Sequence, residues 1–214
     1  MKPYYQDKWV TIYHGDCREV LPQLDVKVDL VLTDPPYNSG LKYSGTQNDN
    51  RPDYWEWLQD RLNPCRQMAT SVLVKHTSRK IRDFQAIWDS QIIVWVKPFS
   101  SGFPYNGLLL HWEPIHLIQG KAIHAMKDYI VASSGNCNKE YSSGHIAQYP
   151  EILGLPLIVA FTEPGQSVLD PFLGSGTTCY CAKKLNRYSI GIEIEERYCE
   201  IAARRCSQDV MVLR

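Results

Sequence analysis

The sequence lacks a long apolar run, an excess of charge of either sign and a recognisable signal peptide. Its longest apolar segment, residues 152–161, contains Gly154 and Pro156 and is too short to span a bilayer. The first residues, Met-Lys-Pro-Tyr-Tyr-Gln-Asp, lack an apolar core, so we expect a cytoplasmic protein. A formal net charge of zero argues against a strong non-specific binder of nucleic acid, although a local basic cleft stays open.

The seven cysteines also lack the spacing of a metal site or a disulfide framework. Their number is odd, no two form a CxxC pair, and no set has zinc-ligand spacing. We therefore expect free, buried thiols in a reducing compartment and no bound metal. A chain of 214 residues, with 44% apolar and 21% charged residues, fits one soluble α/β domain with a sizeable core.

One stretch stands out against this background. The apolar, β-branched run from Val28 to Thr33 predicts a buried parallel strand, and it ends abruptly at Asp34-Pro35-Pro36-Tyr37. The two prolines fix φ and remove two backbone donors, so the strand must end in a stiff turn. In open α/β sheets the crevice at the carboxyl ends of the strands is where ligands bind. An ordinary Asp-Pro turn is the alternative interpretation.

The residue types in this turn suit an aromatic amine. The carboxylate of Asp34 could accept a hydrogen bond from an exocyclic amino group, and the carbonyl of Pro35 could accept a second one. The ring of Tyr37 could stack on a heterocycle. Together these residues predict a pocket for an aromatic base that carries an amino group.

The rest of the first 161 residues alternates between expected strands, helices and loops. Expected strands cover residues 9–14, 71–75, 91–97, 108–110 and 113–119, and expected helices cover residues 17–24, 54–62, 81–90 and 148–161. Asp16 is either another strand-end carboxylate, like Asp34, or the N-cap of the first helix. Asp53 is expected to cap the second helix, and Pro64 to end or kink it. Residues 39–53 predict either a mobile lid or a plain surface loop. The densest basic cluster is either a site for nucleic acid or a solvated helix face, and comprises Lys75, His76, Arg79, Lys80 and Arg82.

A second motif follows, from Val168 to Thr178. It predicts a short strand, a glycine loop and the start of a helix. The next expected strand covers residues 188–193 and ends at Glu193, 23 residues after Asp170. This distance fits a strand–helix–strand unit whose terminal acid binds ribose hydroxyls. The dinucleotide pattern GxGxxG fails at Cys179, a P-loop fails because no lysine follows Gly176, and GxSxG fails at Leu173. A turn without a ligand stays open.

Taken together, the two motifs resemble the DNA amino-methyltransferases, which use S-adenosylmethionine to methylate an exocyclic nitrogen of adenine or cytosine. The first motif, Asp34-Pro35-Pro36-Tyr37, resembles their catalytic motif. The second resembles their donor site, and implies that the following residues bind the donor: Asp170, Pro171, Phe172, Gly174, Ser175, Gly176 and Thr177 around the methionine part, Glu193 at the ribose, and Asp16 with Cys17 beside the adenine amino group.

The catalytic motif precedes the donor motif, and this order resembles the β class of the family. The resemblance implies a Rossmann-like methyltransferase fold with circularly permuted order, and a mostly parallel sheet with an antiparallel edge strand. It also implies a single domain over residues 1–214, with a catalytic half at 1–119 and a donor-binding half at 145–214. Residues 120–144 would form a short target-recognition insertion, and Ser143 to Pro150 would close the donor pocket.

By this resemblance the chain is expected to methylate N6 of adenine in DNA, in a bacterial or phage-type cytoplasm. The Asp of the first motif favours adenine, because the cytosine-N4 enzymes more often resemble Ser-Pro-Pro-Tyr. Cytosine-N4 is the alternative, followed by RNA or another amine and by a non-catalytic nucleic-acid-binding subunit. A base in a duplex must be flipped out to reach the site. A homodimer and a restriction endonuclease partner stay open.

Overall fold

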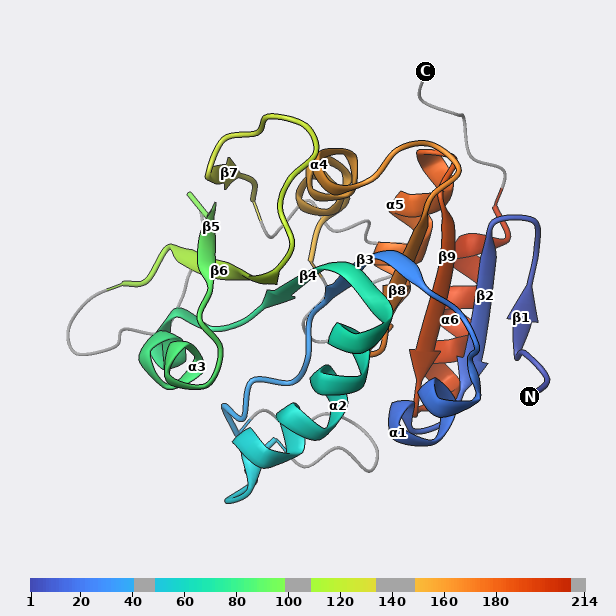
Figure 1. The fold of residues 1–214 in the computed structure, drawn as a ribbon, viewed down its shortest axis with the longest axis horizontal. Coiled ribbons are helices and arrows are strands. Elements are labelled where there is room, and N and C mark those ends of the chain that lie inside the picture. The colour runs from blue at the N-terminus through green and yellow to red at the C-terminus, as the bar shows by residue number, and fades with distance from the viewer. Residues whose placement is uncertain (41–48, 99–108, 134–148, 209–214) are drawn as a thin grey trace.

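The computed structural model describes residues 1–40, 49–98, 109–133 and 149–208, and is built around one twisted sheet (Figure 1). The described part of the sheet contains nine strands. In spatial order they are β1 (Tyr5–Gln6), β2 (Val10–His14), β9 (Tyr188–Glu193), β8 (Ser167–Asp170), β3 (Val28–Thr33), β4 (Ala69–Lys75), β6 (Trp112–Gln119), β5 (Gln91–Val96) and β7 (Tyr129–Val131).

Five neighbouring strands, from β2 to β4, run parallel, so their carboxyl ends lie at one edge of the sheet. From β3 the chain moves outward to β4, whereas from β8 it moves to β9 on the other side. The strand order therefore reverses between β3 and β8, which lie side by side although their residues are far apart in the chain (Figure 1). Such a reversal is where open α/β sheets bind ligands at their carboxyl ends.

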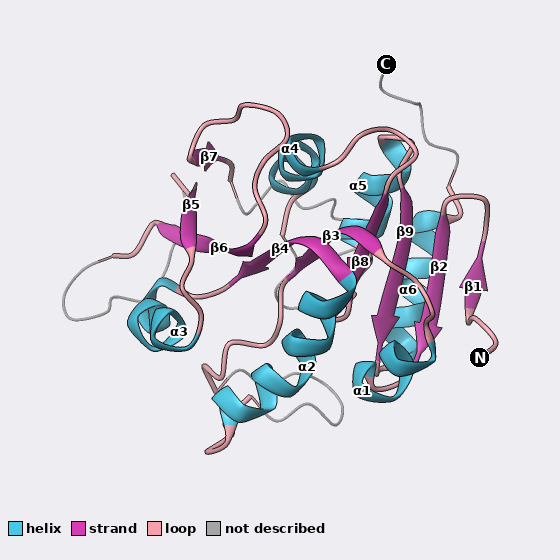
Figure 2. Cartoon of the chain, in the orientation of Figure 1, coloured by secondary structure: helices cyan, strands magenta, loops and turns pink. Residues whose placement is uncertain are grey.

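Helices cover both faces of this sheet (Figure 2). One face packs against α4 (Glu151–Phe161), α5 (Thr177–Lys184) and α6 (Glu196–Cys206). The other face carries α1 (Cys17–Val20), α2 (Tyr54–Met68) and α3 (Ile81–Ile87), with the short 3₁₀ turns η1 (Leu21–Gln23) and η2 (Ser78–Lys80). The three layers explain why the central strands read as continuous apolar runs, because both of their faces are buried.

Strand β3 shows this double burial directly. Leu30 and Leu32 pack into the core cluster beneath α4 and α5, whereas Val31 points into the cluster beneath α2. All three side chains are almost completely buried. At about 25 cal/mol per Å² of buried apolar surface, each contributes roughly 2 kcal/mol to folding. This packing fixes the strand whose end carries Asp34.

Several expected elements have the bounds that the sequence predicts. Strand β3 covers 28–33 and β9 covers 188–193, as expected, and β2, β4 and β5 differ by one or two residues at an end. Helix α3 ends at Ile87 rather than at residue 90. The strand expected at 108–110 is wrong for residues 109 and 110, which lie outside any strand; residue 108 lies outside the described residues. Strand β7 was not expected from the sequence.

Helix α2 corrects two expectations about its ends. It continues through Pro64 to Met68, because its buried side, with Leu58, Leu62 and Cys65, extends past the proline. The packing of this side offsets the lost backbone hydrogen bond. The side chain of Asp53 does not cap the helix; its carboxylate forms an ion pair with Arg51 instead, with a shortest distance of 3.1 Å.

Six of the seven cysteines lie among the described residues, and all six are free and buried, as expected. Cys137 lies outside the described residues. Within the same residues, no helix is both long and apolar enough to cross a membrane.

Gly176, at the start of α5, gives a prediction about stability. Its φ is +81°, and an added Cβ would lie 2.8 Å from the Cβ of Ala202. Gly176→Ala is therefore expected to lower the free energy of unfolding by about 1–3 kcal/mol, measured by urea denaturation. Gly165→Ala is the matched control, because Gly165 has a φ of +84° with no atom within 4 Å of the added Cβ. Equal losses in the two variants would show that the contact with Ala202 is unimportant.

Candidate functional site

The carboxyl edge of the parallel strands brings together the two motifs that the sequence singled out. Asp34 directly follows β3, and Asp170 is the last residue of β8. The hydroxyl of Thr33 donates a hydrogen bond of 2.7 Å to Oδ1 of Asp170, so the two strand ends are joined by a direct contact. The catalytic and donor motifs are therefore neighbours in space, although 136 positions separate their aspartates.

Asp34 is a largely buried carboxylate with two donors. The hydroxyl of Tyr37 donates to its Oδ1 at 2.6 Å, and the ammonium of Lys75 contacts Oδ1 and Oδ2 at 3.3 and 3.1 Å. Burial raises the pKa of Asp34 above its ordinary value, while the charge of Lys75 and the hydrogen bond from Tyr37 oppose that rise. Lys75 and Tyr37 thus favour the ionised carboxylate, which can accept hydrogen bonds, against the effect of burial.

The turn after Asp34 is held from outside by α2. The hydroxyl of Tyr54 donates to the carbonyl of Pro36 at 2.7 Å and lies 2.7 Å from Nε2 of His76. Burial lowers the pKa of His76 to about 3, so the imidazole is neutral. The ring of Tyr37 lies on the same histidine, with 5.0 Å between the ring centres. Both prolines are thus part of a turn whose far side is anchored by an aromatic cluster.

Lys75 connects Asp34 to a second carboxylate that sequence reasoning missed. Lys75 is 6% exposed, and its Nζ lies 2.9 Å from Oε2 of Glu113, which in turn pairs with Lys97 at 2.6 Å. Two cations therefore hold Glu113, and their charges lower its pKa against the effect of burial. The sequence places these three residues at strand ends, but nothing in their local patterns shows that β6 runs antiparallel between β4 and β5.

The basic cluster noted in the sequence is consequently not one solvated helix face. Lys75 and His76 are buried at the end of β4, so that alternative is wrong for both. Lys80 lies nearby, with its ammonium 3.0 Å from the carbonyl of Asn38. The expected lid falls mainly on residues 41–48, which lie outside the described residues, as do 134–148 of the expected recognition and pocket-closing segments.

In the second motif, both carboxylate oxygens of Asp170 accept hydrogen bonds from other residues of the chain. Its Oδ1 accepts from the hydroxyl of Thr33 and from the N–H of Phe172, and its Oδ2 accepts from the hydroxyl of Thr178. Asp170 is 2% exposed, and burial raises its pKa to about 6. Through these contacts Asp170 holds the glycine loop against β3.

Glu193, at the end of β9, is placed opposite the glycine loop. Its Oε2 accepts the N–H of Gly174 at 2.8 Å, and its Oε1 accepts the N–H of Glu195 at 2.9 Å. Burial raises the pKa of Glu193 to about 7. A carboxylate has about four acceptor positions, so acceptor capacity remains for a further donor.

The loop itself is tightly packed on its outer side. Leu173 covers Gly191, where an added Cβ would come within 2.6 Å of the leucine side chain. Phe172 lies against Trp57, with 5.6 Å between ring centres. Pro171, Ser175 and Thr177 are buried, and the hydroxyl of Thr177 accepts from Arg205 at 2.8 Å. The loop therefore lies close against β9, and residues 174–176 lead directly into α5.

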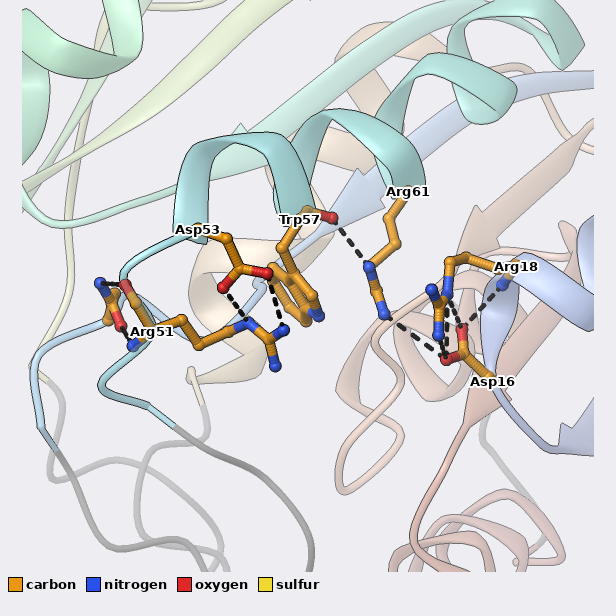
Figure 3. A network of polar contacts seen from close by, with 7 residues as sticks. Asp16, Arg18, Arg51, Asp53, Trp57 and Arg61 are labelled. Atoms are coloured by element: carbon orange, nitrogen blue, oxygen red, sulfur yellow. Dashed lines mark hydrogen bonds and ion pairs between the residues drawn. The ribbon is translucent and has the colours of Figure 1, made fainter.

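Asp16 follows β2 and belongs to a charged network with Arg18 and Arg61, and Arg61 also donates to the backbone carbonyl of Trp57 (Figure 3). Its carboxylate caps α1 by accepting the N–H of Arg18 at 2.9 Å, which confirms the capping interpretation. It also pairs with Arg18 at 2.8 Å and with Arg61 at 3.5 Å. The hydrogen bonds from Arg18 and the nearby arginines hold the pKa of Asp16 below its ordinary value although burial acts to raise it.

Two further residues complete this corner. Burial raises the pKa of Cys17 to about 12, so its thiol stays protonated. The guanidinium of Arg61 stacks 4.2 Å from the centre of the Trp57 ring. Asp16 and Cys17 lie at the same edge of the sheet as the glycine loop. Trp57 and Phe172, which contact each other, lie between this corner and the loop.

Comparison with known proteins now adds a family. Residues 28–204 match the model of the N6/N4 methyltransferases, described as DNA methylase, and this range contains both motifs. The chain belongs to this family of DNA methylases. Among its relatives is the type II methyltransferase M.BglII of Bacillus subtilis, 31% identical over 89% of this chain and 67% of that protein. The resemblance seen in the sequence is confirmed, and the protein is a DNA methyltransferase of the N6/N4 family.

Solved structures confirm the fold. The PvuII DNA methyltransferase, named as cytosine-N4-specific, matches with a TM-score of 0.76 at 19% identity and covers 98% of this chain and 90% of that one. The complex of M1.HpyAVI with SAM matches with a TM-score of 0.70 at 24% identity, over 93% and 100% of the two chains. The expected Rossmann-like, mostly parallel sheet is therefore correct, and β1 is its antiparallel edge strand. The second antiparallel strand, β6, lies inside the sheet.

The raised pKa of Glu193 predicts a pH dependence of stability. A carboxyl whose folded pKa is raised from 4.5 to about 7 stabilises the fold below pH 4.5, and this contribution is lost as the pH rises through 7. The free energy of unfolding of the wild type, minus that of Glu193→Gln, should fall by about 2 kcal/mol between pH 5 and pH 8. Chemical denaturation at several pH values measures it. A difference that stays constant with pH would contradict the burial of an ionisable group at this position.

Proposed function

We propose that the protein transfers a methyl group from S-adenosylmethionine to the exocyclic N6 of adenine in DNA. The observation that carries this proposal is the contact between the strand ends, where Thr33 bonds Asp170 at 2.7 Å. It puts an acceptor for an aromatic amine, Asp34, beside the glycine loop. Proximity of this kind turns a bimolecular transfer into a local one, and can supply much of the acceleration.

The residues around the glycine loop fit the donor. Glu193 keeps acceptor capacity for the ribose hydroxyls, and the loop before α5 brings backbone close to a ligand without a large side chain. Asp16 with Cys17 is the proposed neighbour of the adenine amino group of the donor, and residues 170–177 are proposed to surround its methionine part. When bound, S-adenosylmethionine would supply a methyl group on a positively charged sulfur.

The chain's own part in the reaction is to hold the target amine. Asp34 would accept one N–H of the amino group, and the carbonyl of Pro35 the other, which turns the nitrogen lone pair out of conjugation with the ring. Asp34 does not need to be a strong base, because the charge that develops on nitrogen acidifies its proton. Tyr37 would stack on the base.

We further propose that DNA is the partner and that different segments of the chain have different functions. Residues 1–119 carry the catalytic motif, residues 145–214 carry the donor site, and residues 120–144 between them are proposed to contact the target sequence. In a duplex the target base would be flipped out, at a cost of a few kcal/mol, to reach the end of β3.

Cytosine-N4 is the second candidate. The PvuII enzyme, a structural neighbour of this chain, is named as cytosine-N4-specific. The exocyclic amines of adenine and cytosine offer the same two donors beside a ring nitrogen, so Asp34 and the Pro35 carbonyl could hold either. The aspartate of the first motif supports adenine, because serine is the more usual residue in the resembling cytosine enzymes.

Asp34→Ala tests the catalytic assignment. The variant is expected to lose methyl transfer to DNA by at least about a thousandfold, since the acceptor that positions the amine is gone, while it keeps donor binding. Transfer of a radiolabelled methyl group measures the rate, and calorimetry with S-adenosylhomocysteine measures binding.

Asp25→Ala, an exposed carboxylate just before the same strand, is the control and should transfer at the wild-type rate. Transfer by Asp34→Ala at the wild-type rate would refute the assignment. Mass spectrometry of nucleosides from the methylated DNA identifies the base: N6-methyladenine supports the proposal, and N4-methylcytosine replaces it with the second candidate.

Glu193→Ala tests the donor site. Loss of two charge-assisted hydrogen bonds to ribose is expected to weaken S-adenosylmethionine binding by roughly 10- to 100-fold, as measured by calorimetry. Glu200→Ala on the exposed side of α6 is the control and should bind as the wild type does. If both variants bind the donor with equal affinity, the ribose role of Glu193 is wrong.

A further inference from the structure

The ammonium of Lys75 lies at the centre of the proposed amine pocket, and polar partners surround it. It contacts both oxygens of Asp34, donates to the hydroxyl oxygen of Tyr37 and pairs with Glu113 at 2.9 Å. It also lies 4.8 and 5.2 Å from the ring centres of Tyr37 and Trp95. A lysine whose three protons and whose charge are all satisfied is fixed in position.

This lysine comes to Asp34 from a separate strand. Thr33 at the end of β3 pairs with Val74 in β4. The residues that follow them, Asp34 and Lys75, therefore lie side by side at the edge of the sheet. Glu113 reaches Lys75 from β6, where Ile115 pairs with Lys75. The contact thus depends on the register of three strands rather than on a mobile side chain.

Burying Asp34 without a cation would be costly, since an isolated carboxylate in a protein interior takes up a proton instead. The charged and titratable groups that face it are Lys75, Tyr37, Glu113, Asp170 and Tyr149. Only one of these five, Lys75, is a cation. Among the described residues, Lys75 is therefore the cation that favours the ionised state of Asp34, together with the hydrogen bond from Tyr37.

We propose that Lys75, anchored by Glu113, is a positioning residue that holds the carboxylate of Asp34 ionised and in one orientation to receive the target amine. The proposal rests on the function assigned above to Asp34. Lys75 keeps its place because it is 6% exposed and bonded to Glu113, whereas Tyr37 is only half-buried. A carboxylate has about four acceptor positions, so Asp34 can keep Lys75 and still accept an N–H of the base.

The test compares Lys75→Met with the conservative Lys75→Arg. The methyl-transfer rate constant is measured between about pH 5 and pH 9, with donor and DNA saturating. Lys75→Met should move the acid side of the pH–rate profile upward by at least about one pH unit, because the pKa of Asp34 rises without the cation. Lys75→Arg should restore most of the wild-type profile, since it returns the charge.

Two other variants have a different expected effect. Glu113→Gln keeps an amide oxygen that can accept a hydrogen bond from Lys75 but removes a negative charge that raises the pKa of Asp34, so the acid side should move downward or stay in place. Lys97→Met is the matched control: Lys97 pairs with the same Glu113 at 2.6 Å, but is not among the groups in contact with Asp34. Its acid side should move by less than half as much as that of Lys75→Met.

A rate for Lys75→Met that is unchanged, or that falls equally at every pH, would overturn the proposal. An upward shift of the acid side of the pH–rate profile in Glu113→Gln would also overturn it. So would a shift in Lys97→Met equal to that in Lys75→Met. Binding of S-adenosylhomocysteine by calorimetry shows that each variant is folded; if Lys75→Met is not, the direction of the Glu113→Gln shift decides alone. The result for Asp34→Ala separates the two proposals: if that variant is active, the assigned function fails; if it is inactive and Lys75→Met behaves as the wild type, only the role of Lys75 fails.

Discussion

The pairing of β3 with β8 is the constraint on which the rest of the site depends. These strands belong to distant parts of the chain, and each is buried between two helical layers. Because they are parallel neighbours, the residues that end them, Thr33 with Asp34 and Asp170, must lie together. A one-residue slip in register would turn Leu30 and Leu32 to the opposite face and separate the motifs. The same packing that stabilises the fold therefore fixes the distance between the amine pocket and the donor loop.

The three carboxylates that follow or end the central parallel strands β3, β8 and β9 are Asp34, Asp170 and Glu193, and the protein satisfies each in a different way. Asp170 accepts hydroxyls and a backbone N–H, and needs no counter-ion. Glu193 accepts two backbone N–H groups and keeps acceptor positions open. Of these three, Asp34 alone is paired with a cation among the described residues. Burial raises the pKa of each, and the partners of each carboxylate oppose that rise to a different extent.

The sequence predicted the parts of the site that are local in the chain. Apolar runs that end in Asp34 and in Glu193 gave the correct bounds of β3 and β9, because strands buried on both faces have an unmistakable composition. The glycine loop was recognised because its small residues are required at close approach. Lys75 was assigned to a basic cluster with Arg79 and Lys80, since charge spacing alone does not distinguish a buried ion pair from a solvated face.

That error has a topological cause. Strand β6 runs antiparallel between β4 and β5, so its first residues lie at the same edge as the last residues of its two neighbours. Glu113 therefore meets Lys75 and Lys97, which lie 38 and 16 positions away in the chain. An all-parallel arrangement would place Glu113 at the far edge and leave Lys75 with Asp34 alone. The inserted antiparallel strand thus supplies the charge that anchors the lysine, and the electrostatics of the pocket follow from the strand order rather than from any single motif.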